Sequence, residues 1–244
     1  MKSTIAIIYF VLLSNLLLVQ HSTAARIIYE NNLQQAIPED WQILNPDWSS
    51  TSQGWRGAKH NGNWAILQSP IQLPENYEIT FSSQLEADSV LVEVMLNLAV
   101  DEHSAGQMYR YLGVLYGALN KTLQFEDRSL YAPAYMGEEH YSAQTEDNIG
   151  RLPQAHIEIS TNWVDWRILK LGSDIYIWLN QEEIAHYSDR LNVVPNKGRL
   201  GFVVNGSVYL KNLKVRALDP EEIKKPEYFN NKASLWNRGY ILFQ

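Results

Sequence analysis

Hydrophobic and polar residues alternate with a period of two in several parts of the chain. In residues 77–85, polar residues separate the apolar side chains of Ile79, Phe81 and Leu85. Residues 90–98 show the same alternation, built mainly from Val and Leu. A period of two places successive side chains on opposite faces of a strand, so both segments predict half-buried β-strands. Long stretches with the helical period of 3.6 are scarce.

Further segments with strand-like patterning follow, and turn residues separate them. They are residues 107–117, 156–160, 162–171, 175–179, 184–187, 198–204 and 208–215. Asn205-Gly206 lies between the last two, and Asn-Gly between alternating segments is the strongest short signal for a β-hairpin. About ten short strands without βαβ spacing predict an all-β fold, an antiparallel sandwich or barrel.

Two parts of the chain depart from this pattern. Residues 101–106 and the less regular residues 118–154 predict polar connections, and we interpret the second as a long loop over one sheet. Long loops in compact domains are more often functional than accidental. After residue 217 the pattern changes to a polar tail, so we expect residues 218–244 to be a C-terminal extension rather than a second domain.

The beginning of the chain has the features of a signal peptide. Lys2 precedes an apolar run, residues 5–19, that only Ser14 and Asn15 interrupt. Small residues then lead to Ala25, where we expect cleavage. The alternative is a membrane anchor, but the apolar run has about 15 residues where a spanning helix needs about 20.

We therefore predict a signal peptide over residues 1–25 and one β-sandwich domain over residues 26–217. This organisation predicts a secreted or periplasmic protein with no membrane attachment after cleavage.

The charge and cysteine content exclude several classes of function. The chain has 20 Lys and Arg against 27 Asp and Glu, a formal net charge of −7. An acidic protein without clustered basic residues lacks the electrostatic footprint for nucleic acid. The chain has no cysteine, which excludes disulfides, thiolate metal ligands and cysteine nucleophiles. An exported domain without disulfides fits a bacterial envelope protein better than an animal extracellular one.

The second half of the chain resembles a known family. The resemblance rests on residues 163–168 (WVDWRI), 176–180 (YIWLN), 198–202 (GRLGF) and 208–216 (VYLKNLKVR). These segments resemble strand motifs of concanavalin A-like lectin and glucanase sandwiches, most closely the 3-keto-disaccharide hydrolase-type domain, which is related to laminarinase-type glucanases. The resemblance covers about residues 36–217. One departure is that Gln181, not Gly, follows Asn180.

The resemblance implies an antiparallel two-sheet jelly-roll sandwich and a glycan-directed function. A retaining glucanase of this fold is expected to carry an E-x-D-x-E strand, whose alternation puts the carboxylates on one face about 5 Å apart. Residues 90–98 instead offer Glu93, Met95 and Asn97 on one face. A single carboxylate in place of the set disfavours the normal glucanase mechanism.

Glu93 is the candidate catalytic residue. We expect Glu93 and Asn97 to line the concave face of the sheet, with Tyr109 and Tyr116 from the neighbouring strand as ligand contacts. The alternative is a solvent-exposed sheet face without a ligand.

Tryptophan residues form a second group of candidates, because sugar rings have apolar C–H faces that stack on indoles. We expect Trp48 and Trp55, in a polar region, to bind the ligand in this way. The other strand tryptophans are expected in the core, with Trp166 and Trp178 between the sheets.

Two acid-acid-His triplets, at residues 101–103 and 138–140, lie in predicted loops. A metal site is one interpretation, but adjacent residues rarely supply converging ligands, so solvated charge is the better explanation. We predict no metal site here and no cofactor, although this fold allows a structural Ca²⁺ elsewhere. Glu138 is retained as a candidate ligand contact.

These observations favour a secreted glycan-directed sandwich whose partner is an oligo- or polysaccharide. The resemblance implies a glycoside hydrolase of the 3-keto-glycoside type. Two alternatives stay open: a non-catalytic carbohydrate-binding or lectin-like module, and an envelope adhesion or scaffold domain. An enzyme requires converging acid and base groups, whereas a binding module requires only an aromatic platform and amides.

Overall fold

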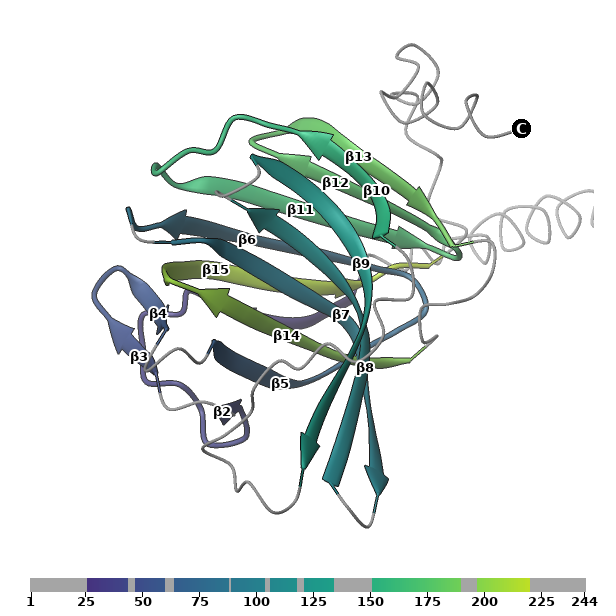
Figure 1. The fold of residues 1–244 in the computed structure, drawn as a ribbon, viewed down its shortest axis with the longest axis horizontal. Coiled ribbons are helices and arrows are strands. Elements are labelled where there is room, and N and C mark those ends of the chain that lie inside the picture. The colour runs from purple at the N-terminus through teal and green to yellow at the C-terminus, as the bar shows by residue number, and fades with distance from the viewer. Residues whose placement is uncertain are drawn as a thin grey trace, which may run out of the picture.

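A computed structural model shows an all-β domain, as predicted (Figure 1). The structure describes residues 26–43, 47–59, 64–87, 89–103, 106–117, 121–133, 151–189 and 197–219. The predicted signal peptide, residues 1–25, and nearly all of the predicted extension lie outside these residues. No helix in the described part is long and apolar enough to cross a membrane.

The strands form two antiparallel sheets that pack face to face. Sheet A contains β1 (Arg26–Asn31), β3 (Trp48–Thr51), β4 (Gly54–Ala58), β6 (Tyr77–Leu85), β11 (Val164–Leu171), β12 (Asp174–Leu179), β13 (Glu182–Ser188) and β15 (Ser207–Ala217). Sheet B contains β2 (Gln42–Ile43), β5 (Ala65–Leu73), β7 (Leu91–His103), β8 (Gly106–Gly117), β9 (Thr122–Pro133), β10 (Arg151–His156) and β14 (Gly198–Asn205). The order in sheet A is β13-β12-β11-β6-β15-β4-β3, with β1 also on β15, and in sheet B β10-β9-β8-β7-β14-β5-β2.

Aromatic rings join the two inner faces. Phe81 and Trp166 of sheet A stack with their centroids 5.2 Å apart. From sheet B, the ring of Tyr116 meets Trp166 edge-on at 5.6 Å, and Phe202 meets Phe81 edge-on at 5.4 Å. The indole Nε1 of Trp166 donates to Ser83 Oγ at 2.8 Å, so its polar atom is satisfied inside the core.

Two predicted connections are wrong. Residues 101–103 extend β7, and much of the predicted loop at residues 118–154 forms β9 and β10. Leu123 and Phe125 of β9 pack in the core, but the residues after them are mostly polar, so the alternation of β9 is weak in the sequence.

Asn205-Gly206 does not form the predicted hairpin, because β14 and β15 belong to different sheets. Gly206, with φ at 108°, carries the chain from sheet B to sheet A. The chain crosses in the opposite direction between β6 and β7, immediately beside it. Val90 N donates to Asn205 O at 2.7 Å and Glu86 N donates to Ser207 O at 2.9 Å, so backbone bonds join the two crossings.

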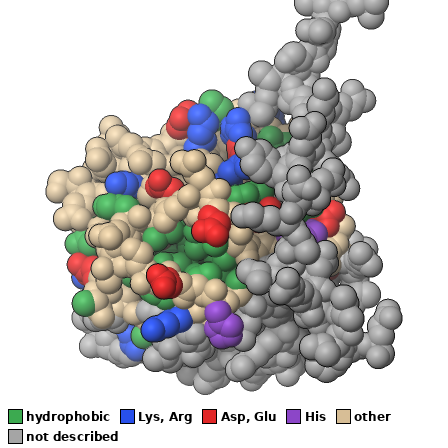
Figure 2. Space-filling view, turned by 90° about the horizontal axis from the view of Figure 1, so that it is seen from above, with side chains coloured by type: hydrophobic (Ala, Val, Ile, Leu, Met, Phe, Trp, Pro, Cys, Tyr) green, Lys and Arg blue, Asp and Glu red, His purple; other side chains and the backbone are tan. Residues whose placement is uncertain are grey.

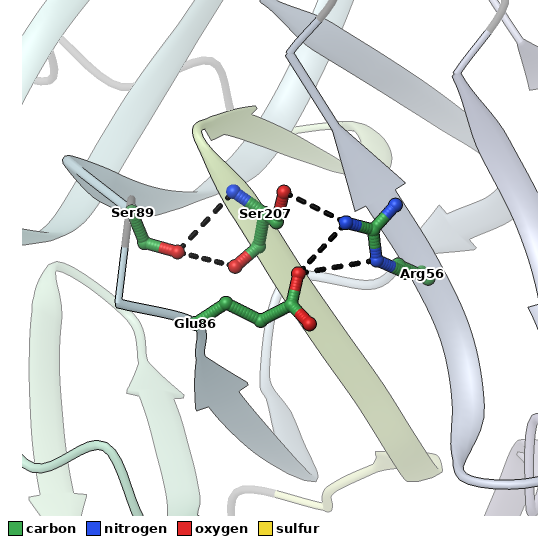
Figure 3. Close-up of polar contacts among 4 residues, drawn as sticks. All are labelled: Arg56, Glu86, Ser89 and Ser207. Atoms are coloured by element: carbon green, nitrogen blue, oxygen red, sulfur yellow. Dashed lines mark hydrogen bonds and ion pairs between the residues drawn. The ribbon is translucent and has the colours of Figure 1, made fainter.

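Side chains reinforce this corner (Figure 3). Ser89 Oγ donates to Ser207 O and accepts from Ser207 N. Arg56 on β4 donates to Glu86 Oε2 at 2.7 Å and to Ser207 Oγ at 2.9 Å. We call Arg56, Glu86, Ser89 and Ser207 the corner cluster.

The β12–β13 turn explains the departure from the family pattern. Asn180 and Gln181 have φ of 50° and 69°, which is the left-handed conformation of a two-residue hairpin turn. Asn180 Oδ1 accepts from Asp165 N at 2.9 Å, and this bond helps to hold the turn without glycine.

The corner cluster predicts a pH-dependent contribution to stability. The hydrogen bond from Arg56 holds the pKa of Glu86 below its ordinary value. The pair therefore stabilises the fold fully above about pH 5, and this contribution is lost as the pH falls through the lowered pKa. We expect Glu86→Gln to lower the free energy of unfolding by about 0.5–1 kcal/mol at pH 7, since both side chains are partly exposed, and by less at pH 3.

Urea denaturation at both pH values measures this difference, with the exposed Glu182→Gln as the control. An equal loss for Glu86→Gln at pH 7 and pH 3 would contradict the assignment.

Candidate functional site

The outer face of sheet B, opposite the core, is shielded from solvent over its central strands. Its described residues on β5, β14, β7 and β8 alternate with core-facing residues such as Leu67, Phe202 and Val94. They are Ile66, Gln68, Glu93, Met95, Tyr111, Gly113, Leu115, Gly201 and Val203, and all of them other than the two glycines are at most 3% exposed. We call this surface the Glu93 face.

Glu93 lies near the centre of this face and is fully buried. It pairs with Leu115 on β8 and Val203 on β14. Its carboxylate extends over β8, where a Cβ at Gly113 would collide with Oε1. Gly113 is therefore the gap that accommodates the carboxylate. A buried carboxylate is costly for a protein, so an ordinary sheet face favours other residues at this position.

Gln68 on β5 is a polar member of the Glu93 face that the sequence analysis missed. It is 1% exposed, and neither atom of its amide has a hydrogen-bond partner in the part of the chain that the structure describes. It pairs with Gly201 on β14, which pairs in turn with Met95 on β7. The available signal was a glutamine at an outward position among apolar residues, just before Ser69-Pro70 interrupts the alternation.

Asn97 is fully buried and lies at a β-bulge in β7. Its φ is 55°, a conformation that asparagine tolerates better than most residues. The backbone of Asn97 lies against Gly198, where a Cβ would collide with the Asn97 carbonyl. The bulge interrupts the simple alternation from which we expected Asn97 to share the face of Glu93.

Tyr116 does not lie on the Glu93 face, and that expectation is wrong. It pairs with Val92, and its ring packs in the core against Trp166. Residues directly opposite each other share a sheet face, so Leu115, not Tyr116, accompanies Glu93. The hydroxyl of Tyr116 accepts from Ser160 N at 3.0 Å, and burial raises its pKa.

The structure does not describe the side chains of two other candidates. Tyr109 lies on β8 in register with Val100, but its side chain is outside the described part. Glu138 and the triplet at residues 138–140 lie outside the described residues altogether.

Trp48 and Trp55 are core residues, which corrects the expectation of an exposed platform. Trp55 is 1% exposed, packs edge-on against Trp41 at 4.9 Å and donates from Nε1 to Gln35 O at 2.8 Å. Trp48 lies over Gly57, where a Cβ would come within 2.8 Å of its ring. The polar residues around them belong to the β3–β4 hairpin, whose other face is buried. Neither indole presents a face to a ligand.

Trp178 was expected between the sheets, as Trp166 is, but lies on the outer face of sheet A. It packs there with Tyr176 and Leu169, and the guanidinium of Arg167 lies 4.5 Å from its ring centroid.

The outer face of sheet A differs in its chemistry from the Glu93 face. Glu78, which is 4% exposed, accepts from Arg167 Nε at 2.6 Å and also from Arg216. Its buried charge is thus compensated by two guanidinium groups. Figure 2, which views the molecule from above, shows a central patch of hydrophobic side chains on the described surface, with acidic side chains around it and Lys and Arg side chains at its upper and lower-left margins. In the described part of the chain, no group of three His, Asp or Glu side chains is placed to hold a metal ion.

Comparisons with known proteins identify the fold. No protein-family profile and no curated protein matches the chain. The carbohydrate-binding module CBM66 from Bacillus subtilis is 12% identical with a TM-score of 0.53, covering 73% of this chain and 96% of its own. A Bacillus subtilis protein of unknown function with a galectin-like fold is 11% identical with a TM-score of 0.59, covering 78% and 96%.

A Parabacteroides distasonis protein described as a candidate glycosyl hydrolase is 14% identical with a TM-score of 0.50, covering 78% of this chain and all of its own. Identities this low show the fold alone. The chain has the concanavalin A-like lectin and glucanase sandwich fold, as the resemblance implied.

A substitution tests whether the missing side chain at Gly113 makes room for the Glu93 carboxylate. We expect Gly113→Ala to lower the free energy of unfolding by about 1–3 kcal/mol, because the new methyl group displaces the Glu93 carboxylate. Gly117→Ala on the same strand is the matched control, since its Cβ would meet nothing closer than 3.9 Å.

Chemical denaturation measures both variants, and Gly113→Ala is also made in a Glu93→Ala background. There the cost should fall, because the colliding carboxylate is gone. An unchanged cost would show that Gly113 does not serve Glu93.

Proposed function

We propose that this chain is a glycan-binding sandwich protein whose ligand lies on the Glu93 face. The observation that carries the proposal is the concentration of buried polar groups on this outer sheet face. Glu93 and Gln68 lie there, and Asn97 lies at the bulge beside them, all at most 1% exposed. Amide and carboxylate groups are groups that bind sugar hydroxyls, and burying them costs free energy that apolar residues at the same positions would not cost.

The fold supports a glycan-directed function without deciding its kind. One structural neighbour is a carbohydrate-binding module and another is described as a candidate glycosyl hydrolase. The same sandwich hosts both activities, so function must be argued from the site. Among the described side chains of the Glu93 face, Glu93 is the only carboxylate, and this favours binding over acid–base catalysis by a pair.

We propose that the protein is secreted or periplasmic and belongs to a bacterium. The sequence of residues 1–25, which resembles a signal peptide, supports export. Polysaccharides are abundant in that compartment, and a cysteine-free domain needs no disulfide formation there.

A hydrolase, with the 3-keto-glycoside type implied by the family resemblance, is the second candidate. One observation favours it: position 126 on β9 is a glutamate in register with Gly113, over which the Glu93 carboxylate extends. β8 separates the two strands, whose backbones are therefore about 9.6 Å apart, but the Glu93 carboxylate extends over Gly113 of β8 and so lies about one strand spacing, about 4.8 Å, from the β9 backbone. This distance is compatible with the spacing that glycosidases use between two carboxylates. Glu93 and Glu126 would then be the acid–base pair.

Glu93→Gln tests the site. We expect binding of the best oligosaccharide from a glycan array to weaken about tenfold to a hundredfold, because a charged hydrogen-bond acceptor is lost. An unchanged thermal midpoint beside the lost affinity would assign the effect to the ligand contact rather than to the fold. The exposed Glu158→Gln is the matched control and should change neither quantity.

Isothermal titration calorimetry and thermal unfolding measure these effects on the mature protein. Wild-type affinity in Glu93→Gln would remove Glu93 from the site. Release of sugar from bound glycans decides between the two functions. Binding without release supports the module, and release that both Glu93→Gln and Glu126→Gln abolish supports the hydrolase.

A further inference from the structure

The amide of Gln68 is the most conspicuous unsatisfied polar group of the Glu93 face. The side chain is 1% exposed, and neither Oε1 nor Nε2 is hydrogen-bonded within the described residues. A buried donor and acceptor without partners cost free energy that a Leu or Met at the same place would not. Gln68 at this position therefore lowers the stability of the fold, so a role in folding does not explain its presence.

Across the sheet, the neighbour of Gln68 towards the centre of the Glu93 face has no side chain that could pair with the amide. The next residue across the sheet is Gly201, which has no side chain, and the methyl group of Met95 lies where a Cβ of Gly201 would be. Ile66, two residues earlier on the same strand, is apolar and 2% exposed. The amide thus lies beside an apolar patch formed by a thioether and an aliphatic side chain.

The neighbour of Gln68 on the other side of the ladder does not bond to its amide either. Gln68 lies opposite Gln42 of β2, which is exposed. Ser69, the next residue, directs its hydroxyl to Leu200 O at 2.7 Å and accepts from Ile71 N. The local polar network of β5 is complete without the Gln68 side chain.

We infer that Gln68 reads a pair of hydroxyl groups on an uncharged sugar ring. One hydroxyl donates to Oε1 and the oxygen of the other accepts from Nε2, so a vicinal diol satisfies both atoms. The apolar C–H groups of the same ring then contact Met95. The residues that define this face include no Lys or Arg, so it offers no cation to the carboxylate of an acidic sugar. The inference rests on the proposed function, since it places the same ligand on the same face and names its chemistry.

Gln68→Leu tests the inference, with Gln72→Leu as the matched control. Gln72 is an exposed glutamine on the same strand. The probes are neutral hexaoses (cello-, laminari-, xylo- and mannohexaose) and hexagalacturonate, titrated into wild type, both variants and Glu93→Gln. We expect Gln68→Leu to weaken binding of a neutral hexaose about tenfold or more, while its thermal midpoint stays or rises. Gln72→Leu should leave both quantities unchanged.

The outcomes separate this inference from the proposed function. Wild-type affinity in Gln68→Leu together with lost affinity in Glu93→Gln would overturn the role of Gln68 and leave the site in place. A lower thermal midpoint in Gln68→Leu would overturn it too, because the amide would then have a partner within the fold. Tighter binding of hexagalacturonate than of any neutral hexaose would overturn the uncharged ligand. A wild type that binds none of the probes would overturn the proposed function and this inference with it.

Discussion

The paired crossings at the corner cluster are the constraint on which the rest of the structure depends. β6 and β15 are neighbours in sheet A, and their continuations β7 and β14 are neighbours in sheet B. The β6–β7 and β14–β15 connections change sheets at the same place, and backbone hydrogen bonds join them there. The register of one sheet is therefore tied to that of the other. Leu91 is held opposite Asn205, and Glu93 therefore lies opposite Val203 on the outward side of the sheet.

The two outer faces of the sandwich differ in their buried polar groups. On sheet A, Glu78 lies between two arginines, so its burial is compensated within the fold. On sheet B, Glu93 and Gln68 are as deeply buried among apolar neighbours, and glycines leave room around them. The first arrangement stabilises a folded surface, whereas the Gln68 amide, which has no hydrogen-bond partner among the described residues, is the group that we propose a polar ligand satisfies.

Strands could be predicted well where the apolar residues of an alternating segment are those that pack in the core. The prediction was poorer where pairing between distant segments decides which sheet a strand joins. β6 has its predicted bounds because the apolar residues of its inner face coincide with the core. Asn205-Gly206 indicates a tight change of direction, but nothing local tells whether the next strand joins the same sheet. Trp48 and Trp55 have polar neighbours because only one face of their hairpin is buried. The composition of the segment does not show which of its residues lie on that face.

The candidate site divides in the same way. Glu93 could be predicted because a carboxylate alternates there with core-facing valines and Leu96. Tyr116 was assigned to the wrong face, because its facing depends on a pairing with Val92 that the sequence does not contain. Gln68 could not be singled out without the burial that the neighbouring strands impose.

Met95 provides the most direct test of the central claim that the Glu93 face is the ligand-binding face. Its methyl group lies in the middle of that face, beside Gly201. In protein labelled with ¹³C at methionine methyl groups, and with the signal assigned through Met95→Leu, titration with a bound oligosaccharide should shift the Met95 resonance saturably. Calorimetric binding that leaves the Met95 resonance unmoved would place the ligand elsewhere and contradict the account.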